Sequence, residues 1–95
     1  MINIKICFLS ILADITGKKE INLVVNENST IKQILETLIF KFGKEFEKTI
    51  FNSPNDLSNY IILGLNGKQI RSFDYLNKVI QEGDEISFLP AIAGG

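Results

Sequence analysis

The sequence contains no histidine, no tryptophan and a single cysteine, and these absences exclude several kinds of site. Histidine is the usual general base near neutral pH, so the Ser–His and Cys–His pairs of nucleophilic enzymes cannot be assembled. One cysteine without histidine supplies too few ligands for a structural zinc site. Cys7 cannot form an intrachain disulfide, which favours a reducing compartment.

Neither sign of charge is in surplus, and no long apolar run is present. Ten basic and eleven acidic residues give a formal charge of -1, whereas nucleic-acid binders and polybasic membrane anchors carry excess Lys and Arg. No stretch approaches the ~20 apolar residues of a membrane span. The apolar start is interrupted by Asn3, Lys5 and Ser10 and lacks signal-peptide features. We expect a cytoplasmic domain with neither nucleic acid nor membrane as a partner.

The first 25 residues have the pattern of a β-hairpin. Ile2–Leu9 alternates apolar and polar residues over most of its length and is rich in β-branched side chains, which predicts a strand. Asp14–Lys19 is typical of a turn, in which Gly17 can adopt a positive φ. Glu20–Val25 alternates again and predicts the second strand.

A helix follows, and it carries signals at both ends. Thr30 and Gln33 fit a capping box at its start, and Gly43 suits the residue just past its end. Lys44–Phe51 predicts a short second helix. The apolar stripe of the first helix has a spacing of three and four residues and consists of Ile31, Ile34, Leu35, Leu38, Ile39 and Phe42.

Three further strands are predicted after these helices. Tyr60–Leu65 is apolar on both faces and therefore suits the interior of a sheet. Asn66–Gly67 is a strong signal for a type I′ turn, and Lys68–Arg71 would return from it. Glu85–Leu89 predicts the last strand, which Pro90 closes.

The order strand, strand, helix, strand, strand, strand predicts an α+β fold. One main helix packs across one face of a mixed sheet, which is the β-grasp, or ubiquitin-like, order. At 95 residues, of which 45% are apolar, the chain suits a single core. We expect one domain over residues 1–90 and a flexible C-terminal tail over residues 91–95.

The tail sequence ends in two glycines, Gly94 and Gly95. A frayed chain end is one interpretation, because chain ends are commonly mobile. The other is functional: glycine lacks Cβ, so such a tail can enter a tunnel too narrow for other residues and present its carboxylate there. A carboxylate must be activated before it reacts, most simply as an acyl-adenylate made from ATP. The activated carbonyl can then accept sulfide or an amine.

The chain resembles the MoaD family, the small sulfur-carrying subunit of molybdopterin synthase. The stretches that carry the resemblance are Leu65–Ile70, Glu82–Pro90, Gly94–Gly95 and, near the N-terminus, Ala13–Gly17. The resemblance implies that a MoeB-like, E1-type enzyme uses ATP to adenylate the Gly95 carboxylate. A sulfur donor then converts it to a thiocarboxylate, which gives its sulfur to a pyranopterin on a MoaE-like large subunit. The chain is then a co-substrate and subunit with no bound cofactor, not a free-standing enzyme.

The resemblance also implies a docking surface. The matching apolar positions are Leu9, Ile70 and Leu89, which we expect on the open face of the sheet, where exposed apolar clusters mark contact surfaces. Alternatively, these residues complete the core. The remaining partner-binding residues are those of the tail. They are Pro90, Ala91, Ile92 and Ala93, and Ala91 stands where the family often has a second proline.

Three alternatives share the same fold. A ubiquitin-like modifier would join Gly95 to target lysines, and related archaeal proteins also serve in tRNA thiolation. A ThiS-like carrier for thiazole synthesis is opposed by the long segment between Gly43 and Asn59. A plain interaction module would leave the glycines incidental.

Other polar residues have simpler interpretations than a reactive site. Cys7 lies mid-strand and suits an inert, packed thiol. Asp14, Asp74 and Asp84 lie in turn contexts, where short carboxylates cap backbone amides, and we expect no metal site.

Overall fold

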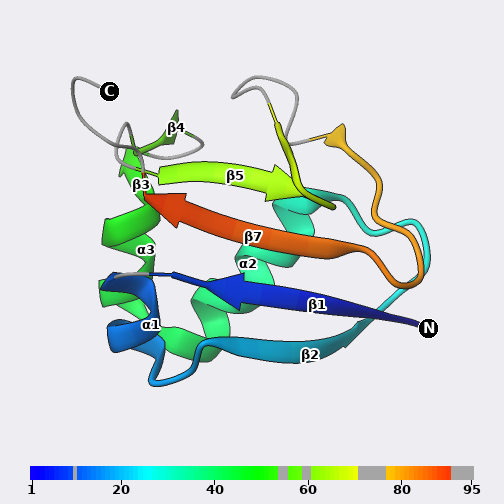
Figure 1. Ribbon diagram of the computed structural model, residues 1–95, viewed down its shortest axis with the longest axis horizontal. Coiled ribbons are helices and arrows are strands. Elements are labelled where there is room, and N and C mark those ends of the chain that lie inside the picture. The colour runs from blue at the N-terminus through cyan, green and yellow to red at the C-terminus, as the bar shows by residue number, and fades with distance from the viewer. Residues whose placement is uncertain (10, 54–55, 59–60, 71–76, 91–95) are drawn as a thin grey trace.

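The computed structural model describes residues 1–9, 11–53, 56–58, 61–70 and 77–90, and it is built on a five-stranded mixed sheet (Figure 1). The strand order is β2-β1-β7-β5-β6. The central pair, β1 and β7, is parallel, and all other neighbours are antiparallel. The five strands are β1 (Ile2–Phe8), β2 (Glu20–Val25), β5 (Ile61–Leu65), β6 (Lys68–Gln69) and β7 (Glu85–Pro90).

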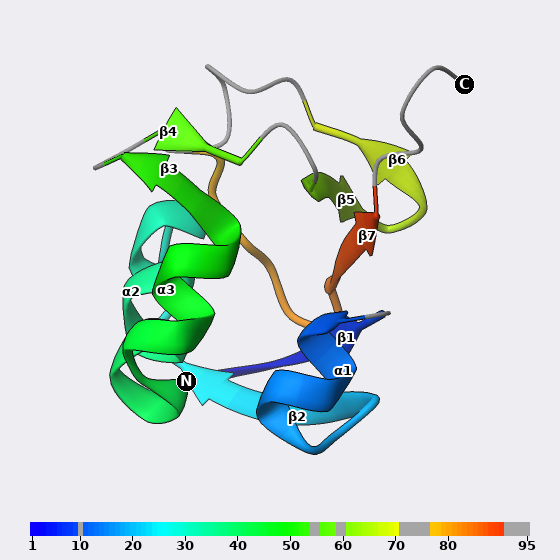
Figure 2. The ribbon, with the colours of Figure 1, turned by 90° about the vertical axis from the view of Figure 1, so that its left-hand side faces the viewer.

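Two helices cover one face of this sheet, α2 (Ile31–Phe42) and α3 (Lys44–Ile50) (Figure 2). The predicted capping box is confirmed. The Gln33 amide donates to Thr30 Oγ1 at 3.3 Å, and the Thr30 amide donates to Gln33 Oε1 at 2.9 Å. Gly43 ends α2 with φ 92° and directs the chain straight into α3. The sequence therefore encodes both helices and the break between them.

The core lies between these helices and the sheet. Ile2, Ile4, Ile6 and Phe8 of β1 all point into it, as their alternation predicts. Its centre is aromatic. Phe8 contacts the rings of Phe42, Phe46 and Phe88 at centroid distances of 5.5, 5.9 and 5.8 Å.

One helix was not predicted. The structure places α1 (Ile11–Thr16) where the sequence indicates only a turn. Leu12 is completely buried, so one apolar anchor holds this short helix against the core. Gly17, at φ 76°, ends it by donating its amide to the carbonyl of Ala13 at 2.9 Å. A six-residue helix is too short to show a full apolar stripe, and tertiary burial decides its formation.

The later turns follow the sequence closely. Asn66 and Gly67 have φ values of 52° and 85°, which confirms the type I′ turn. The return strand β6 is two residues long, and the predicted ends Tyr60 and Arg71 lie outside the described residues. A small second sheet joins β3 (Phe51–Ser53) to β4 (Asp56–Leu57), so Phe51, which was predicted to end the second helix, begins a strand instead.

The arrangement is the predicted β-grasp. A β-hairpin precedes the main helix, and β7 lies in the middle of the sheet between β1 and β5. The first turn of α2 is fixed by a segment that comes later in the chain, because the Ile31 amide donates to the carbonyl of Lys78 at 2.9 Å. Among the described residues, no helix has the length and apolarity needed to cross a lipid bilayer.

Candidate functional site

The sheet has one face that α2 and α3 leave uncovered, and the predicted docking residues must be placed relative to it. Side chains alternate between the two faces along each strand. Residues 4, 6 and 8 of β1 point toward the helices, so the open face takes residues 3, 5 and 7. The strand registers extend this assignment to β2, β7 and β5.

An apolar patch lies at one end of this open face. Phe8 and Phe88 form the last pair of the parallel register, and Leu9 and Leu89 directly follow these two residues. Leu89 also pairs with Ile62 of β5. Leu9 and Leu89 are 43% and 37% exposed, and Ile62 is half-buried. We call Leu9, Ile62 and Leu89 the open-face patch.

The structure thus brings two of the three predicted docking residues together and adds Ile62. The sequence held a signal for Ile62, because the strand of residues 60–65 is apolar on both faces. Single exposed apolar side chains are normal on a protein surface, but an exposed cluster of them commonly marks a contact surface.

Ile70 lies elsewhere. Its amide donates to the carbonyl of Leu63 at 2.8 Å, and the β5–β6 register places the two residues opposite each other. Leu63 is buried beneath the helices, and Ile70 is half-buried and packs against the same core. For Ile70, completion of the core is therefore the interpretation that the geometry supports.

Strand β7 determines where the tail starts. Its final residue, Pro90, pairs with Ile61 of β5, and the preceding Leu89 belongs to the open-face patch. A chain leaving Pro90 therefore starts beside this patch. Five predicted site residues lie outside the described residues. They are Ala91, Ile92, Ala93, Gly94 and Gly95.

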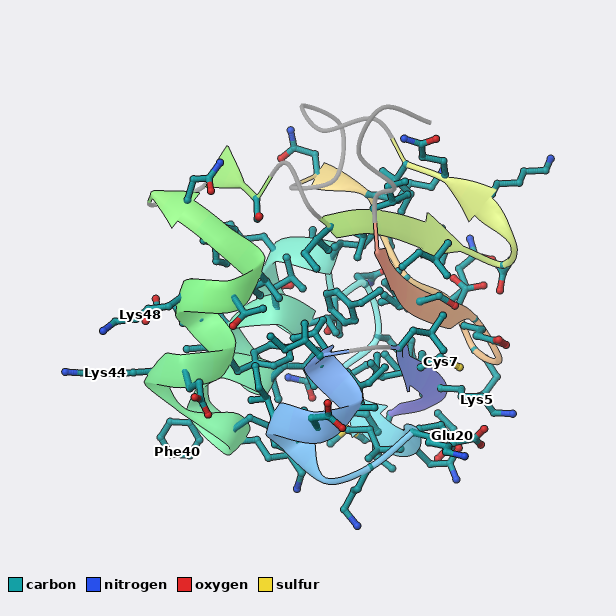
Figure 3. All side chains as sticks on the ribbon, turned by 60° about the vertical axis from the view of Figure 1, so that its left-hand side comes forward. Lys5, Cys7, Glu20, Phe40, Lys44 and Lys48 are labelled. Atoms are coloured by element: carbon teal, nitrogen blue, oxygen red, sulfur yellow. The ribbon has the colours of Figure 1, made fainter. Side chains whose placement is uncertain are left out.

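Three small residues form a row across the open face next to the patch, and this row ends at Glu20. Gly64 pairs with Ser87, which pairs with Cys7, which pairs with Glu20. Glu20 also meets Lys5, with 3.6 Å between Oε2 and Nζ. Figure 3 shows Lys5, Cys7 and Glu20 together, on the opposite side from Phe40, Lys44 and Lys48 of the helical layer. The open face therefore has an apolar end at the open-face patch and, next to it, a row of small residues that ends at the charged pair of Glu20 and Lys5.

Cys7 is held as a thiol by its surroundings. Its Sγ lies 3.7 Å from Glu85 Oε2, toward which it donates a weak hydrogen bond. Burial raises the pKa of Cys7, and the Glu85 carboxylate raises this pKa further, both by its charge and by accepting the hydrogen bond. Lys5 acts in the opposite direction but more weakly. Because the thiolate is the nucleophile, this environment supports the inert role predicted from the sequence.

A pH profile of thiol labelling checks this account. Glu85→Gln removes a negative charge beside Sγ, which lowers the pKa of Cys7 toward its ordinary value. At any pH below that pKa more thiolate is present, so iodoacetamide should label the variant several-fold faster, and the profile should move to lower pH. Glu45→Gln, on α3, is the matched control and should leave the profile unchanged. An unshifted Glu85→Gln profile would contradict the assigned cause.

The predicted turn carboxylates have structural roles where they are described. Asp84 accepts from the Gln81 amide at 2.8 Å and from Asn66 Nδ2 at 2.9 Å, and so ties the 81–84 turn to the β5–β6 turn. Asp14 lies in α1 and not in a turn, and Asp74 lies outside the described residues. Within the described ranges, no group of three acidic or cysteine side chains is placed to hold a metal ion.

Comparison with known proteins identifies the family of this chain. The ThiS family matches residues 6–95, which is nearly the whole chain. The chain belongs to the ThiS family. The long segment after Gly43, which argued against a ThiS-like chain, does not exclude membership, and much of it forms α3 and the β3–β4 pair.

Relatives of this ThiS-family chain bear two kinds of name. A candidate sulfur carrier protein of Archaeoglobus fulgidus is 35% identical over 69 residues, which are 73% of this chain and 77% of the relative. The solution structure of small archaeal modifier protein 1 from Methanosarcina acetivorans is 26% identical. It has a TM-score of 0.79 and covers 100% of this chain and 98% of its own.

A third similarity concerns an assembly. One chain in the crystal structure of the BexX/CysO complex of Amycolatopsis orientalis has a TM-score of 0.73 and 22% identity. The match covers 97% of this chain and 99% of the other. At this identity the likeness establishes the shared fold.

Proposed function

We propose that this ThiS-family protein carries sulfur as a thiocarboxylate on Gly95 and delivers it for molybdopterin synthesis. One observation carries the proposal: the central strand β7 ends beside the open-face patch. The folded body can therefore dock on a partner through the patch while the tail extends from the same place. Five residues at ~3.3 Å each reach about 17 Å, which is enough to bring the Gly95 carboxylate into a partner's active site.

The proposed chemistry has two steps on the partner enzyme. A Gly95 carboxylate oxygen attacks the α-phosphorus of ATP, and pyrophosphate leaves as the acyl-adenylate forms. Sulfide then adds to the acyl carbon and expels AMP, leaving a thiocarboxylate on Gly95. Glycine at positions 94 and 95 presents no side chain to either reaction, so access to the carbonyl carbon is unhindered. This chain supplies the carried group, and its partners supply the catalysis.

The molybdopterin role rests on the resemblance of residues 65–70 and 82–90 to MoaD. It implies three partners: a MoeB-like activating enzyme, a sulfur donor and a MoaE-like large subunit. The sulfur-carrier name of the Archaeoglobus fulgidus relative supports the carrier chemistry in general.

A second function uses the same activated Gly95. In a ubiquitin-like modifier, a lysine amine in place of sulfide attacks the acyl carbon and forms an isopeptide bond. The likeness to small archaeal modifier protein 1, at 26% identity over the whole chain, favours this alternative. Conjugates linked through Gly95 in cell lysate would identify it, and a carrier for tRNA thiolation would instead be recognised by its RNA acceptor.

Intact mass spectrometry tests the carrier chemistry. The protein is incubated with a MoeB-like enzyme, ATP and sulfide, and the mass should rise by the difference between sulfur and oxygen, located on Gly95. Adding a MoaE-like subunit loaded with pyranopterin should return the mass to its starting value. An unchanged mass, with an enzyme proven active on its own carrier, would overturn the thiocarboxylate proposal. A stable thiocarboxylate that the MoaE-like subunit does not discharge would overturn only the molybdopterin assignment.

Docking through the open-face patch predicts the behaviour of Leu89→Asp. A charge at this position must be desolvated in a contact, so binding to the activating enzyme should weaken about tenfold or more. Leu89 is 37% exposed and lies in the central strand, where Asp is disfavoured, so the free energy of unfolding should fall by only about 1 kcal/mol and the variant should stay folded. Phe40→Asp is the matched control, since Phe40 is 93% exposed on α2. Calorimetric titration measures both variants, and equal affinities would exclude the patch as the docking surface.

A further inference from the structure

We infer that the free edge of β2 is a self-pairing surface, through which two copies of this chain join their sheets into one. Figure 1 shows β2 at one edge of the sheet. The other edge, β6, is protected by its length of two residues and by Lys68. Strand β2 has six residues that keep a regular register with β1 and include no proline, lysine or bulge. An edge without these protections is suited to pairing with another strand.

The hydrogen-bonding groups on this edge can be identified residue by residue. The Phe8 amide donates to the carbonyl of Lys19 at 2.8 Å, so this pair is a hydrogen-bonded one. Hydrogen-bonded and non-hydrogen-bonded pairs alternate along an antiparallel ladder. Residues 19, 21, 23 and 25 therefore bond to β1, and Glu20, Asn22 and Val24 direct their amides and carbonyls outward. Within the part of the chain that the structure describes, these outward groups have no partner.

The next outward backbone positions on either side, Lys18 and Asn26, already take part in hydrogen bonds within the chain. The Lys18 amide and carbonyl bond to the Thr16 hydroxyl at 3.2 and 3.0 Å. The Asn26 carbonyl accepts from the amide and the hydroxyl of Ser29 at 3.3 and 2.6 Å. The available groups are thus three consecutive outward positions, centred on Asn22.

Such a set is complementary to itself in one antiparallel register. Asn22 lies opposite Asn22 of the second copy on the two-fold axis, and Glu20 lies opposite Val24. All three outward residues of each copy are then bonded. In any other antiparallel register that sets outward residues opposite outward residues, at least one of the three lacks a complete hydrogen-bonding partner. The side chains also agree, because opposite residues of an antiparallel pair share a face. Ile21 meets Leu23 beneath the sheet, and both are half-buried in a single copy.

The charges fit the same register. Glu20 is the only charged residue of β2 and lies opposite the apolar Val24. The two Glu20 carboxylates of the dimer are offset by four residues, which is about 14 Å along the strand. Opposed like charges are therefore avoided. The contact spans only five residues per copy, so we expect a weak dimer that forms as concentration rises.

Two measurements on the full chain test the pairing. Sedimentation equilibrium over a wide concentration range should show a monomer–dimer equilibrium. Amide hydrogen exchange by NMR should show protection of residues 20, 22 and 24 that rises with concentration, while residues 21, 23 and 25 stay protected throughout. A monomer at every concentration would overturn the inference. So would a dimer whose amides 20, 22 and 24 stay unprotected, because it would use another surface.

Positive and negative charges introduced at Val24 should change the dimer Kd in opposite directions. Val24→Lys places an ammonium opposite each Glu20, and since the symmetry counts every pair twice, the dimer Kd should fall about tenfold. Val24→Glu should raise the Kd by a similar factor, and adding Glu20→Lys should restore it. Val79→Lys, on the 77–80 segment, is the matched control for net charge and should change the Kd little. Equal responses of the two Val24 variants would contradict the register.

Asn22→Pro isolates the backbone bonds. Proline removes an amide that points away from β1, so the intrachain ladder stays intact, while both bonds at the two-fold axis are lost. Dimer formation should disappear, whereas Asn22→Thr, which keeps the amide, should retain it. A circular-dichroism melting curve shows whether the Asn22→Pro variant is folded. If it is not, the charge variants at Val24 still test the register.

Discussion

Removal of Gly94 and Gly95 is expected to abolish both adenylation and sulfur loading, while the fold survives. The proposed reaction needs a carboxylate at the end of a tail that has the correct length and no side chains. Among the described residues, the buried apolar side chains lie between positions 2 and 88, and we expect the core to form without the tail. Pyrophosphate release with a MoeB-like enzyme should fall to background. The free energy of unfolding by urea should change by less than about 0.5 kcal/mol.

Two further variants test separately whether the tail must lack side chains and whether it must have its present length. Gly95→Ala keeps the length and the carboxylate but adds one methyl group, so it tests how narrow the partner's tunnel is. An alanine added after Gly95 keeps both glycines but moves the carboxylate, and it should be inactive. If the truncated chain still releases pyrophosphate, the reactive carboxylate is not that of Gly95. If it unfolds, the tail is structural.

Phe8→Ala is expected to have the largest effect on stability. Phe8 is fully buried and contacts the rings of Phe42, Phe46 and Phe88. Truncation of a buried phenylalanine to alanine costs about 3–5 kcal/mol, through lost transfer free energy and the cavity left behind. A domain of this size has about 5–15 kcal/mol of stability in total. Urea denaturation should therefore show a large fall in the midpoint.

The protein contains its own control for this experiment. Phe40→Ala makes the same chemical change at a side chain that is 93% exposed. It should alter the free energy of unfolding by less than about 0.5 kcal/mol. A similar cost for both variants would show that Phe40 contributes to packing and that the aromatic centre of the core is misassigned.

The sequence predicted those elements whose signals are local. The capping box of Thr30 and Gln33, and the Asn66–Gly67 turn, depend on residues within a few positions of one another. The period-two pattern of β1 and the helical stripe of α2 likewise carry their own evidence. Because these signals agreed with the element order of a β-grasp, the topology could be predicted as well.

The errors arose where tertiary contacts decide. Helix α1 is six residues long and depends on burial of Leu12, which no local pattern reveals. Ile70 was expected on the open face because it matches a docking position of the family that the chain resembles. Its amide instead donates to the carbonyl of Leu63, which continues the β5–β6 pairing, and its side chain packs against the core. A register depends on how two strands pair, so periodicity within one strand cannot fix which face a short return strand presents.

The central position of β7 also governs how the protein folds. Lys5 pairs with Glu85 and Phe8 with Phe88, so the parallel pair at the middle of the sheet joins positions about 80 residues apart. Contacts of such sequence separation slow folding. The β1–β2 hairpin is at best marginal alone, and β1 and β5 have no strand between them until residues 85–90 arrive. A nascent chain must therefore be synthesised at least that far before its core can close. Pro90, the last residue of β7, reaches its partner Ile61 only when this strand inserts, so we expect the proposed activation to be restricted to chains that have completed folding.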